Sequence, residues 1–503
     1  MNQKVRVRFA PSPTGPLHIG GVRTALYNYL FAKKHKGTFI LRIEDTDQTR
    51  FVQGATEYIL ESLTWCGIEP EEGPHKPGNF GPYTQSERKN IYQEHIQQLI
   101  QSGHAYYAFD TADELEQKRE AEKNLGNANW QYDASTRNDM RNSLTLNQQE
   151  VNELLNQGVA YTIRAKIEPD QIVTFNDIIR GEITVQTNVL DDKVLFKSDG
   201  LPTYHFANIV DDHLMEISHV IRGEEWLPST ALHHLLYQFF GWEAPQFAHL
   251  PLILKPDGKG KLSKRDGDQL GFPVFPLNWK TADGEVFPGY RENGYLKESF
   301  VNMLAFLGWN PGTEQELFSL DELAASFTLE RVNKSGARFD PDKTKWFQQQ
   351  YLKNLSNSEL LELIRPDLPQ SRYSETELQK ICGLFKERVV FASDIISSAK
   401  YFFEAPQEYD EKTTKKKWKE NSATLLTEFS AFMEQLETFD STNIESCFHQ
   451  FLETKEVGLG QVMPTLRLAL TGEGGGPQIF DIAELLGKQA VLDRINAAVQ
   501  RLG

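Results

Sequence analysis

Residues 5–43 read VRVRFAPSPTGPLHIGGVRTALYNYLFAKKHKGTFILRI, and their pattern predicts the architecture of the N-terminal part of the chain. Residues 5–9 alternate apolar and basic side chains and end at a proline-rich loop, which predicts a short strand. A helix should follow, because apolar residues recur at helical spacing: Val22, Ala25, Leu26, Tyr29 and Leu30. Gly37 closes that helix, and residues 38–43 are rich in strand-forming side chains. The sequence therefore predicts a βαβ unit of a parallel sheet, with ligands bound where its strands end.

The composition indicates a globular chain of several domains. The chain has 503 residues, and at 100 to 200 residues per domain this predicts roughly three to four domains. The 53 basic and 70 acidic residues give a net charge of −17. That charge argues against a protein that binds nucleic acid through a broad positive surface, so any such contact must use local patches.

The cysteines and the N-terminus indicate a reduced compartment. Cys66, Cys382 and Cys447 stand far apart, so they predict free thiols and form neither a disulfide framework nor a paired-cysteine zinc motif. The first residues alternate charge with valine where a signal peptide needs an apolar stretch, and no later apolar run approaches 18 residues. We expect a cytoplasmic protein with no membrane contact.

Later segments differ in character along the chain. Thr84 and Glu87 predict a capping box for a helix that ends at Gly103, and residues 110–160 are polar enough to suggest an inserted subdomain. A helix is expected over residues 229–240, before Gly241. Beyond residue 340 the pattern is mostly helical. It includes a basic cluster with one aromatic side chain: Lys415, Lys416, Lys417, Trp418 and Lys419.

Two short motifs suit a nucleotide. Residues 16–21, PLHIGG, lie where the first strand's loop enters the first helix, so glycines, the helix N-terminus and an imidazole can all face a phosphate. Residues 261–265, KLSKR, place three cations on a glycine-rich loop, which suits a polyphosphate. Taken alone, each motif fits an ordinary surface turn better than a nucleotide site.

The pairing of these motifs resembles the two signature sequences of class I aminoacyl-tRNA synthetases. Further stretches are similar to the glutamyl-tRNA synthetase family: RFAPSPTG at 8–15, RIEDTD at 42–47, YHFAN at 204–208 and IRGEEW at 221–226. Residues 463–472, MPTLRLALTG, resemble that family's anticodon-binding region. The resemblance therefore covers nearly the whole chain.

The resemblance implies an α/β fold with five segments. It implies a Rossmann-like parallel-sheet catalytic domain with an inserted α+β subdomain, followed by an all-α anticodon-binding region. The expected boundaries are 1–105 and 204–270 for the catalytic halves, 106–203 for the acceptor-binding insertion, 271–340 for an insertion and stem-contact region, and 341–503 for the helical region. We also expect a monomer.

The implied activity is ATP-dependent attachment of L-glutamate to tRNA(Glu). Attack of the glutamate α-carboxylate on the ATP α-phosphorus releases pyrophosphate, and the adenylate is then transferred to the terminal adenosine of tRNA. Mg²⁺ should accompany ATP.

Site residues follow by similarity, position by position. The resemblance assigns catalysis to His18, Lys261 and Lys264. It assigns ATP binding to Pro11, Thr14, Gly15, His18, Gly20, Gly21, Trp226, Lys264 and Arg265. Arg8 and Tyr204 would hold the glutamate side chain, Arg222 and Asn208 the α-carboxylate region, and Ser12 with Glu44 the ammonium group. Contact with tRNA is expected at Lys415, Lys416, Lys417 and Trp418, although a solvated helix face is equally consistent with them.

Three departures from the family stand out. Gly21 replaces the second histidine of many class I enzymes, a change typical of glutamyl enzymes. Some relatives bind zinc through cysteines in the insertion, whereas residues 106–110 and Thr136 offer no thiolate here, so no structural zinc is expected. Residues 272–279, FPVFPLNW, look longer than the usual connection, and we interpret them as a surface elaboration.

Several alternatives stay open. A close one is a non-discriminating enzyme that also glutamylates tRNA(Gln). A shortened relative that glutamylates a tRNA base, a glutaminyl enzyme ending in β-barrels, and a small-molecule nucleotidyltransferase all fit the helical C-terminal region less well. A non-enzymatic tRNA-binding protein should have lost His18, Lys264 or Arg8, and all three are present.

Overall fold

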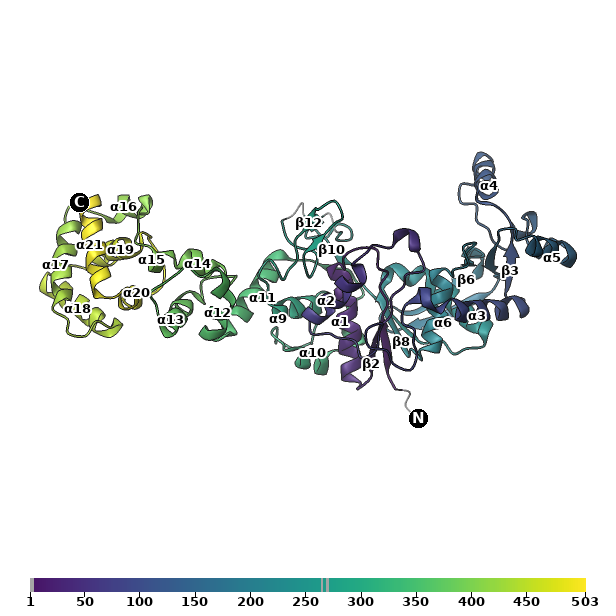
Figure 1. The fold of residues 1–503 in the computed structure, drawn as a ribbon, viewed down its shortest axis with the longest axis horizontal. Coiled ribbons are helices and arrows are strands. Elements are labelled where there is room, and N and C mark those ends of the chain that lie inside the picture. The colour runs from purple at the N-terminus through teal and green to yellow at the C-terminus, as the bar shows by residue number, and fades with distance from the viewer. Residues whose placement is uncertain (1–3, 264–265, 268–270) are drawn as a thin grey trace. The chain divides into compact units, whose positions relative to one another are not determined.

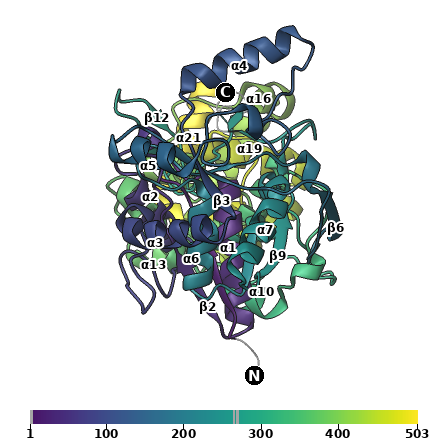
Figure 2. The same cartoon turned by 90° about the vertical axis from the view of Figure 1, so that its right-hand side faces the viewer.

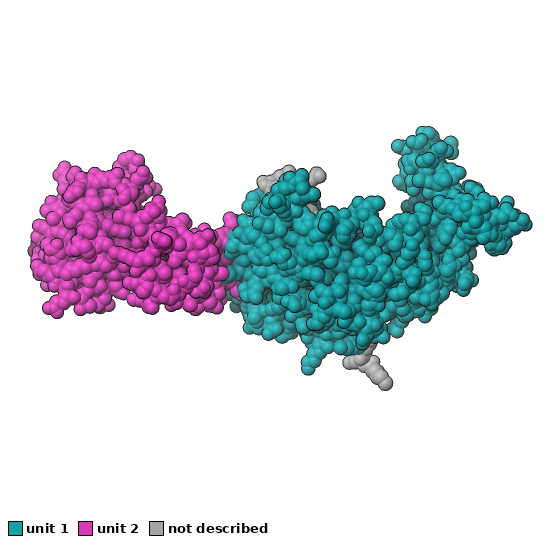
Figure 3. Space-filling view, in the orientation of Figure 1, with its two compact units in different colours: residues 1–344 teal, residues 345–503 magenta. Residues whose placement is uncertain are grey.

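The structure is a computed structural model that describes residues 4–263, 266–267 and 271–503. It divides into two compact units, residues 1–344 and residues 345–503, which are coloured separately in Figure 3. The three cysteines are buried and form no disulfide, as expected. Across the described residues, no helix combines the length and apolar character needed to cross a membrane.

The first unit is built on a six-stranded sheet with the strand order β2-β1-β8-β9-β5-β6. Its strands are β1 (Arg6–Phe9), β2 (Thr38–Leu41), β5 (Ile172–Asp177), β6 (Gly181–Gln186), β8 (His219–Gly223) and β9 (Gln246–Leu250). β1 is parallel to β2 on one side and to β8 on the other, and β8 is parallel to β9. The strand order therefore reverses beside β1, which is where ligands bind in open α/β sheets.

The predicted βαβ unit is confirmed. Helix α1 (Ile19–Lys34) connects the parallel strands β1 and β2. The helix ends three residues before Gly37, and the left-handed residue is Lys36, with φ of 52°. Gly37 is required for a different reason: a Cβ there would lie 2.3 Å from the Val5 carbonyl oxygen.

The edge of the sheet is formed by the β5–β6 hairpin. The insertion predicted at residues 106–203 contains this hairpin, but the structure pairs β5 with β9 and so adds both strands to the main sheet. A separate three-stranded sheet, in the order β3-β4-β7, forms the core of the insertion. The insertion consists of β3 (Ala105–Ala108), α4 (Ala112–Asn124), α5 (Gln148–Asn156), β4 (Thr162–Ala165) and β7 (Val194–Phe196), with α4 standing clear of the main sheet in Figure 1 and Figure 2.

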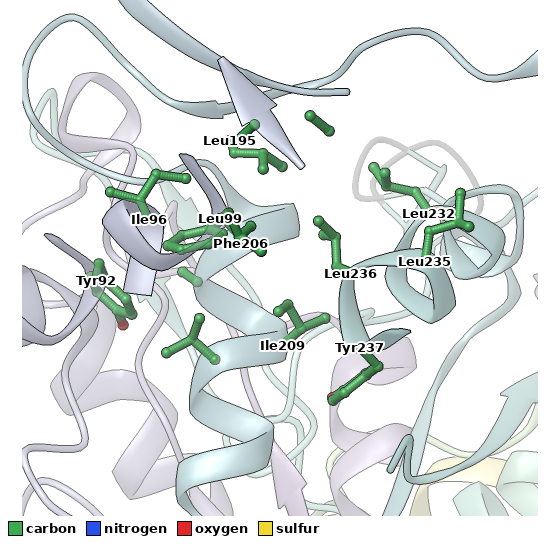
Figure 4. Packing of buried hydrophobic residues seen from close by; sticks show 14 of the residues in the cluster. Tyr92, Ile96, Leu99, Leu195, Phe206, Ile209, Leu232, Leu235, Leu236 and Tyr237 are labelled. Atoms are coloured by element: carbon green, nitrogen blue, oxygen red, sulfur yellow. The ribbon is translucent and has the colours of Figure 1, made fainter. Parts of the chain in front are cut away.

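A cluster of buried apolar side chains joins one face of the sheet to three helices (Figure 4). These helices are α3 (Lys89–Gln101), α6 (Tyr204–Leu214) and α7 (Thr230–Phe240). The α7 prediction is confirmed, because Gly241 ends the helix in the left-handed conformation. The predicted capping box is wrong: residues 85–88 form a 3-10 turn, α3 begins after it, and the Thr84 side chain caps nothing.

Residues 272–279 are part of the core rather than a surface elaboration. Val274, Phe275 and Leu277 are all buried. The backbone amide of Ile19 donates to the Val274 carbonyl at 2.9 Å, and the Tyr58 hydroxyl donates to the Leu277 carbonyl at 2.6 Å. The segment therefore supports the start of α1.

The remaining elements of the first unit surround this framework. They are α2 (Ala55–Trp65), β10 (Ile253–Leu254), β11 (Trp279–Lys280), β12 (Val286–Phe287), α9 (Lys297–Ala305), α10 (Leu320–Ser326) and β13 (Ala337–Arg338).

The second unit is formed by helices joined through short loops. They follow α11 (Pro341–Asn354) and are α12 (Asn357–Ile364), α13 (Glu375–Phe385), α14 (Asp394–Ser398), α15 (Lys400–Phe403), α16 (Glu411–Lys417), α17 (Ser422–Glu434), α18 (Ser441–Thr454), α19 (Leu459–Thr471), α20 (Ile479–Leu486) and α21 (Lys488–Leu502). The predicted fold class, a parallel-sheet α/β region followed by a helical region, is confirmed.

Candidate active site

Two adjoining cavities lie at the carboxyl ends of β1, β8 and β9. The first has a volume of about 480 Å³ and is lined by the loop after β1, the start of α1 and the segment around Lys261. The second has a volume of about 260 Å³ and is lined by β1, α6 and β8. Ser12, Gly20 and Gly21 line both cavities, so a ligand in one can reach a ligand in the other.

The first cavity gathers most residues predicted to bind ATP. Those that line it are Pro11, Thr14, Gly15, His18, Gly20 and Gly21, and Lys261, predicted to be catalytic, lines it as well. Trp226 lines the second cavity instead, where its ring packs on Tyr204 with centroids 4.0 Å apart. Lys264 and Arg265 lie outside the described residues.

His18 caps the N-terminus of α1. Its Nδ1 accepts a hydrogen bond from the Gly20 amide at 3.1 Å. A neutral imidazole that accepts at Nδ1 carries its proton on Nε2, so that nitrogen is the donor. The ring therefore combines a helix N-terminus with an N–H donor beside the first cavity.

Glu225 is a residue of this site to which the sequence analysis gave no role. It lines both cavities, and its Oε1 lies 3.3 Å from the Lys261 Nζ. Both side chains are exposed, so this ion pair contributes little to stability and can yield to a phosphate. Spacing along the sequence gave no signal that Glu225 faces Lys261.

The second cavity brings together every residue predicted to bind glutamate. Its lining includes Arg8, Ser12, Glu44, Tyr204, Asn208 and Arg222. Among the residues that the structure describes, the buried Nδ2 of Asn208 has no hydrogen-bond partner. An unsatisfied buried donor is costly, which makes it a point where a ligand acceptor would bind.

A buried ionic network forms the floor of this cavity. Arg8 binds Asp212 through two hydrogen bonds of 3.0 Å, and Arg42 donates to Asp212 at 2.7 Å and to Glu44 at 2.9 Å. Arg88 binds Asp211 at 2.7 Å and completes the set. Three arginines thus face three carboxylates, so the positive charge of Arg8 is already balanced.

Burial and neighbouring charge compete at the two carboxylates nearest the cavity. Burial acts to raise the pKa of Asp212, but Arg8 and Arg42 hold it below its usual value. At Glu44 burial prevails and raises the pKa, against the attraction of Arg42 and Arg8. Asp212 therefore stays ionised and holds the guanidinium groups of Arg8 and Arg42 in place.

The partners of Arg222 among the described residues are all uncharged. Its guanidinium donates to the Tyr204 hydroxyl at 3.1 Å, the His249 Nε2 at 3.0 Å, the Thr230 hydroxyl at 3.0 Å and the His233 Nδ1 at 3.2 Å. Within the described part of the chain, no carboxylate forms a salt bridge with it. The side chain is only 5% exposed, so it adds a buried and unbalanced positive charge to the cavity.

Histidines around Arg222 make the first unit sensitive to acid. Burial, reinforced by nearby cations, lowers the pKa of His205 to about 4 and lowers that of His233 well below its usual value. Because the unfolded histidines titrate near pH 6.5, protonation between pH 6.5 and pH 4 favours the unfolded state. These neutral histidines therefore stabilise the fold at neutral pH and lose that contribution as the pH falls.

We expect the thermal midpoint of the first unit to fall when the pH is lowered from 7.5 to 5.0. Protonation of His205 alone should lower the free energy of unfolding by about 2 kcal/mol at pH 5. Differential scanning calorimetry at both pH values measures the shift, and His205→Gln should reduce it. A midpoint that does not move would contradict the account of these histidines.

The inserted subdomain holds itself together with a buried polar cluster. Asp192 is fully buried and accepts hydrogen bonds from Tyr106 at 2.7 Å, the Ile167 amide at 3.0 Å and Arg137 at 3.2 Å.

The described residues include no group of three His, Cys, Asp or Glu side chains suited to a metal. The absence of structural zinc stays a prediction.

The basic cluster of the second unit lies at the end of α16. Lys415, Lys416 and Lys417 are exposed, and Trp418 is half-buried directly after the helix. Lys415 pairs with Glu411 at 3.2 Å across one helical turn.

Comparison with known proteins covers both units. Residues 4–346 match the family described as tRNA synthetases class I (E and Q), catalytic domain, and residues 359–499 match the family described as anticodon binding domain. The glutamate–tRNA ligase of Christiangramia forsetii is 55% identical over 505 residues and covers 100% of both chains. That of Parabacteroides distasonis is 57% identical over 99% of both chains.

A solved structure agrees with these matches. The crystal structure of a glutamate tRNA ligase from Elizabethkingia meningosepticum in complex with its amino acid has a TM-score of 0.96 and 52% sequence identity. The match covers 99% of this chain and 100% of that chain. The chain has a parallel sheet with two cavities at its carboxyl edge and a helical second unit, and more than half of its residues are identical to those of full-length relatives. It therefore belongs to the glutamate–tRNA ligases, a family of class I aminoacyl-tRNA synthetases.

Proposed function

We propose that this ligase activates L-glutamate with ATP in the two adjoining cavities and then transfers it to the 3′-terminal adenosine of tRNA(Glu). The observation that carries the proposal is the contrast between the cavities. One has a helix N-terminus and a lysine for phosphate, and the other has a buried, unbalanced arginine for a carboxylate.

The orientation of glutamate follows from which residues line which cavity. The α-carboxylate must reach the α-phosphorus, so it belongs near the shared wall at Ser12. Arg222 lines only the second cavity and lies 3.1 Å from the Tyr204 hydroxyl, which supports a shared ligand at the far end. We therefore propose the side-chain carboxylate for Arg222 and Tyr204, in place of the α-carboxylate suggested for Arg222 by the resemblance.

The other glutamate residues fit around this orientation. Asn208 would donate its Nδ2 to a carboxylate oxygen, which supplies the missing partner of that buried donor. Arg8 would add a second, weaker positive contact because Asp212 already balances it. Ser12 and Glu44 would accept from the ammonium group.

ATP would lie in the first cavity with its phosphates at the start of α1. His18 would donate from Nε2 as charge develops on the α-phosphate, and Lys261 would neutralise the leaving pyrophosphate after parting from Glu225. Lys264 and Arg265 keep their predicted parts in ATP binding, whereas Trp226, which lines the second cavity, would lie beside the glutamate with Tyr204. Mg²⁺ would be held chiefly by the phosphates, because Mg²⁺ usually binds through one or two carboxylates plus substrate phosphates.

A substitution that fills part of the first cavity should weaken ATP binding without disturbing the fold. A Cβ at Gly20 would meet only the His18 Nδ1, at 3.5 Å, so a larger side chain extends into the cavity without striking the core. We expect Gly20→Val to raise the KM for ATP by about tenfold or more, and to raise the KM for glutamate too because Gly20 lines both cavities, while the thermal midpoint changes little. Steady-state kinetics measures this, and an unchanged KM for ATP would remove Gly20 from the nucleotide site.

Transfer of glutamate needs a bound tRNA. By similarity, the 2′-hydroxyl of the terminal adenosine would attack the adenylate, and we assign no side chain as its base. Lys416, Lys417 and Trp418 would contact the anticodon region, since exposed lysines bind phosphates and an aromatic ring can stack on an unpaired base. We also propose that the enzyme is a monomer in solution.

Aminoacylation tests the proposed function directly. Purified protein with ATP, Mg²⁺, total tRNA and labelled glutamate should yield acid-precipitable label, and labelled glutamine should yield none. Absence of glutamyl-tRNA under these conditions would overturn the proposal. The comparisons do not favour a non-discriminating enzyme, so glutamylation of tRNA(Gln) is not proposed.

A further inference from the structure

Behind Arg222 lies a chain of buried hydrogen bonds that crosses three strands. Arg222 on β8 donates from Nε to the His249 Nε2 on β9 at 3.0 Å. The His249 Nδ1 lies 2.6 Å from the Asp177 Oδ2, at the end of β5. His249 and Asp177 are fully buried, and neither lines the cavities.

The protons in this chain can be placed from the hydrogen bonds around Asp177. Its Oδ1 accepts from the amides of Ile179 at 3.0 Å and Arg180 at 2.8 Å, and its Oδ2 accepts from the amide of His249 at 3.1 Å. A carboxylate held by that many donors stays ionised. His249 therefore donates from Nδ1 to Asp177 and presents an unprotonated Nε2 to Arg222.

We propose that Asp177 and His249 are positioning residues that orient the Arg222 guanidinium for the side-chain carboxylate of glutamate. This inference rests on the proposed role of Arg222. A guanidinium is a planar fork, so fixing its Nε also fixes the two terminal nitrogens that reach Tyr204, Thr230 and the cavity. Both terminal nitrogens also lie 3.2 Å from the His233 Nδ1, so a fork held at this angle would present to the carboxylate the N–H that lies beside Tyr204.

The inference also gives the β5–β6 hairpin a function. The hairpin contributes no residue to either cavity, yet it completes the sheet edge beside β9, and its first strand ends at Asp177. One route from the hairpin to the substrate runs through His249. We infer that the hairpin, through Asp177, fixes the tautomer of His249, and that His249 in turn fixes the orientation of the Arg222 guanidinium.

Asp177→Asn is the decisive variant. Asn has nearly the shape of Asp, but its NH₂ group must face either the two amides of Ile179 and Arg180 or the single amide and the ring of His249. The second choice is cheaper, because the histidine can move its proton to Nε2 and accept at Nδ1. Two N–H groups, on His249 and Arg222, would then face each other across 3.0 Å, and the guanidinium must turn away.

We expect this variant to raise the KM for glutamate by about 10- to 100-fold, by analogy with the loss of a carboxylate that orients a metal-binding histidine. The KM for ATP and kcat should change by no more than about twofold. Aminoacylation kinetics at saturating tRNA measures all three.

Asp192→Asn is the matched control. Asp192 is also fully buried and also accepts from a side chain and a backbone amide, but it lies in the inserted subdomain away from Arg222. It should lower the thermal midpoint without raising the KM for glutamate. A rise in the KM of both variants would mean that destabilisation alone explains the effect and would overturn the inference.

His249 offers a rescue test. His249→Phe removes the acceptor and should reproduce the Asp177→Asn phenotype. His249→Gln can place an amide oxygen near the Nε2 position, so it should recover most of the wild-type KM for glutamate. Equal kinetics for the Phe and Gln variants would contradict the positioning role.

Arg222→Leu, measured in the same assays, distinguishes a failure of this inference from a failure of the proposed function. If Arg222→Leu loses glutamate binding while Asp177→Asn and His249→Phe are normal, the positioning role is wrong and the glutamate site stands. If Arg222→Leu itself keeps a normal KM for glutamate, the proposed site is wrong.

Discussion

Arg222→Leu should lower kcat/KM for glutamate by roughly 10² to 10³-fold, because removing one partner of a buried charge pair costs about 2 to 5 kcal/mol. The guanidinium is the one cation of the second cavity for which the described residues give no carboxylate partner. Without it, the substrate side chain would bring an unpaired negative charge into a buried site. Most of the loss should appear in the KM for glutamate, measured by aminoacylation at saturating ATP and tRNA.

Arg222→Lys is the matched control. It keeps the charge but loses the fork that reaches Tyr204, His249 and Thr230 at once, so its kcat/KM should fall between the wild type and the Leu variant. The KM for ATP should stay near the wild-type value in both. Saturation of Arg222→Leu at the wild-type glutamate concentration would refute the assignment.

His18→Asn should lower kcat by about 10²- to 10³-fold, the usual cost of losing a donor that meets charge in the transition state. Asn is one of the best N-caps, so it should replace the hydrogen bond that the His18 Nδ1 accepts from Gly20. The variant therefore removes the Nε2 donor but keeps the start of α1 intact. The rate of pyrophosphate exchange and the thermal midpoint measure the two effects separately.

His18→Ala serves as the comparison, because it loses the donor and the cap together. Its kcat should match that of His18→Asn, while its stability should be lower by about 0.5 to 2 kcal/mol. A His18→Asn enzyme with near-normal exchange would show that His18 acts only as a helix cap.

The sequence predicted the framework of the site well, because that framework is local. A strand, a proline-rich loop and a helix within forty residues fix where His18, Gly20 and Ser12 must lie relative to β1. The six predicted glutamate residues, far apart in sequence, then line one cavity because the ends of parallel strands share one edge.

The partners of those residues could not be predicted from spacing. Asp212, which balances Arg8, lies 204 positions away, and His249 lies 27 positions from Arg222. Such pairs depend on strand order, and strand order depends on where the β5–β6 hairpin joins the sheet. The hairpin lies beside polar, insertion-like sequence, so nothing local indicated that it would pair with β9.

Two local predictions failed because tertiary contacts outweighed local signals. Thr84 and Glu87 have the spacing of a capping box, but Arg88 and Gln85 are drawn into hydrogen bonds with Asp211, and the chain forms a 3-10 turn before α3. Pro273 and Pro276 belong to a stretch, residues 272–279, that we interpreted as a surface elaboration because it looks longer than the usual connection. The residues between and beside them are buried against α1 and α2.

The most direct test of the central claim is glutamate-dependent exchange of pyrophosphate into ATP, run with glutamate or glutamine and with or without total tRNA. Resemblance to glutamyl enzymes predicts that exchange appears only when tRNA is present. The unbalanced positive charge of Arg222 predicts that glutamate supports exchange and glutamine does not. Exchange that glutamine supports equally well, or no exchange with glutamate and tRNA together, would contradict the account.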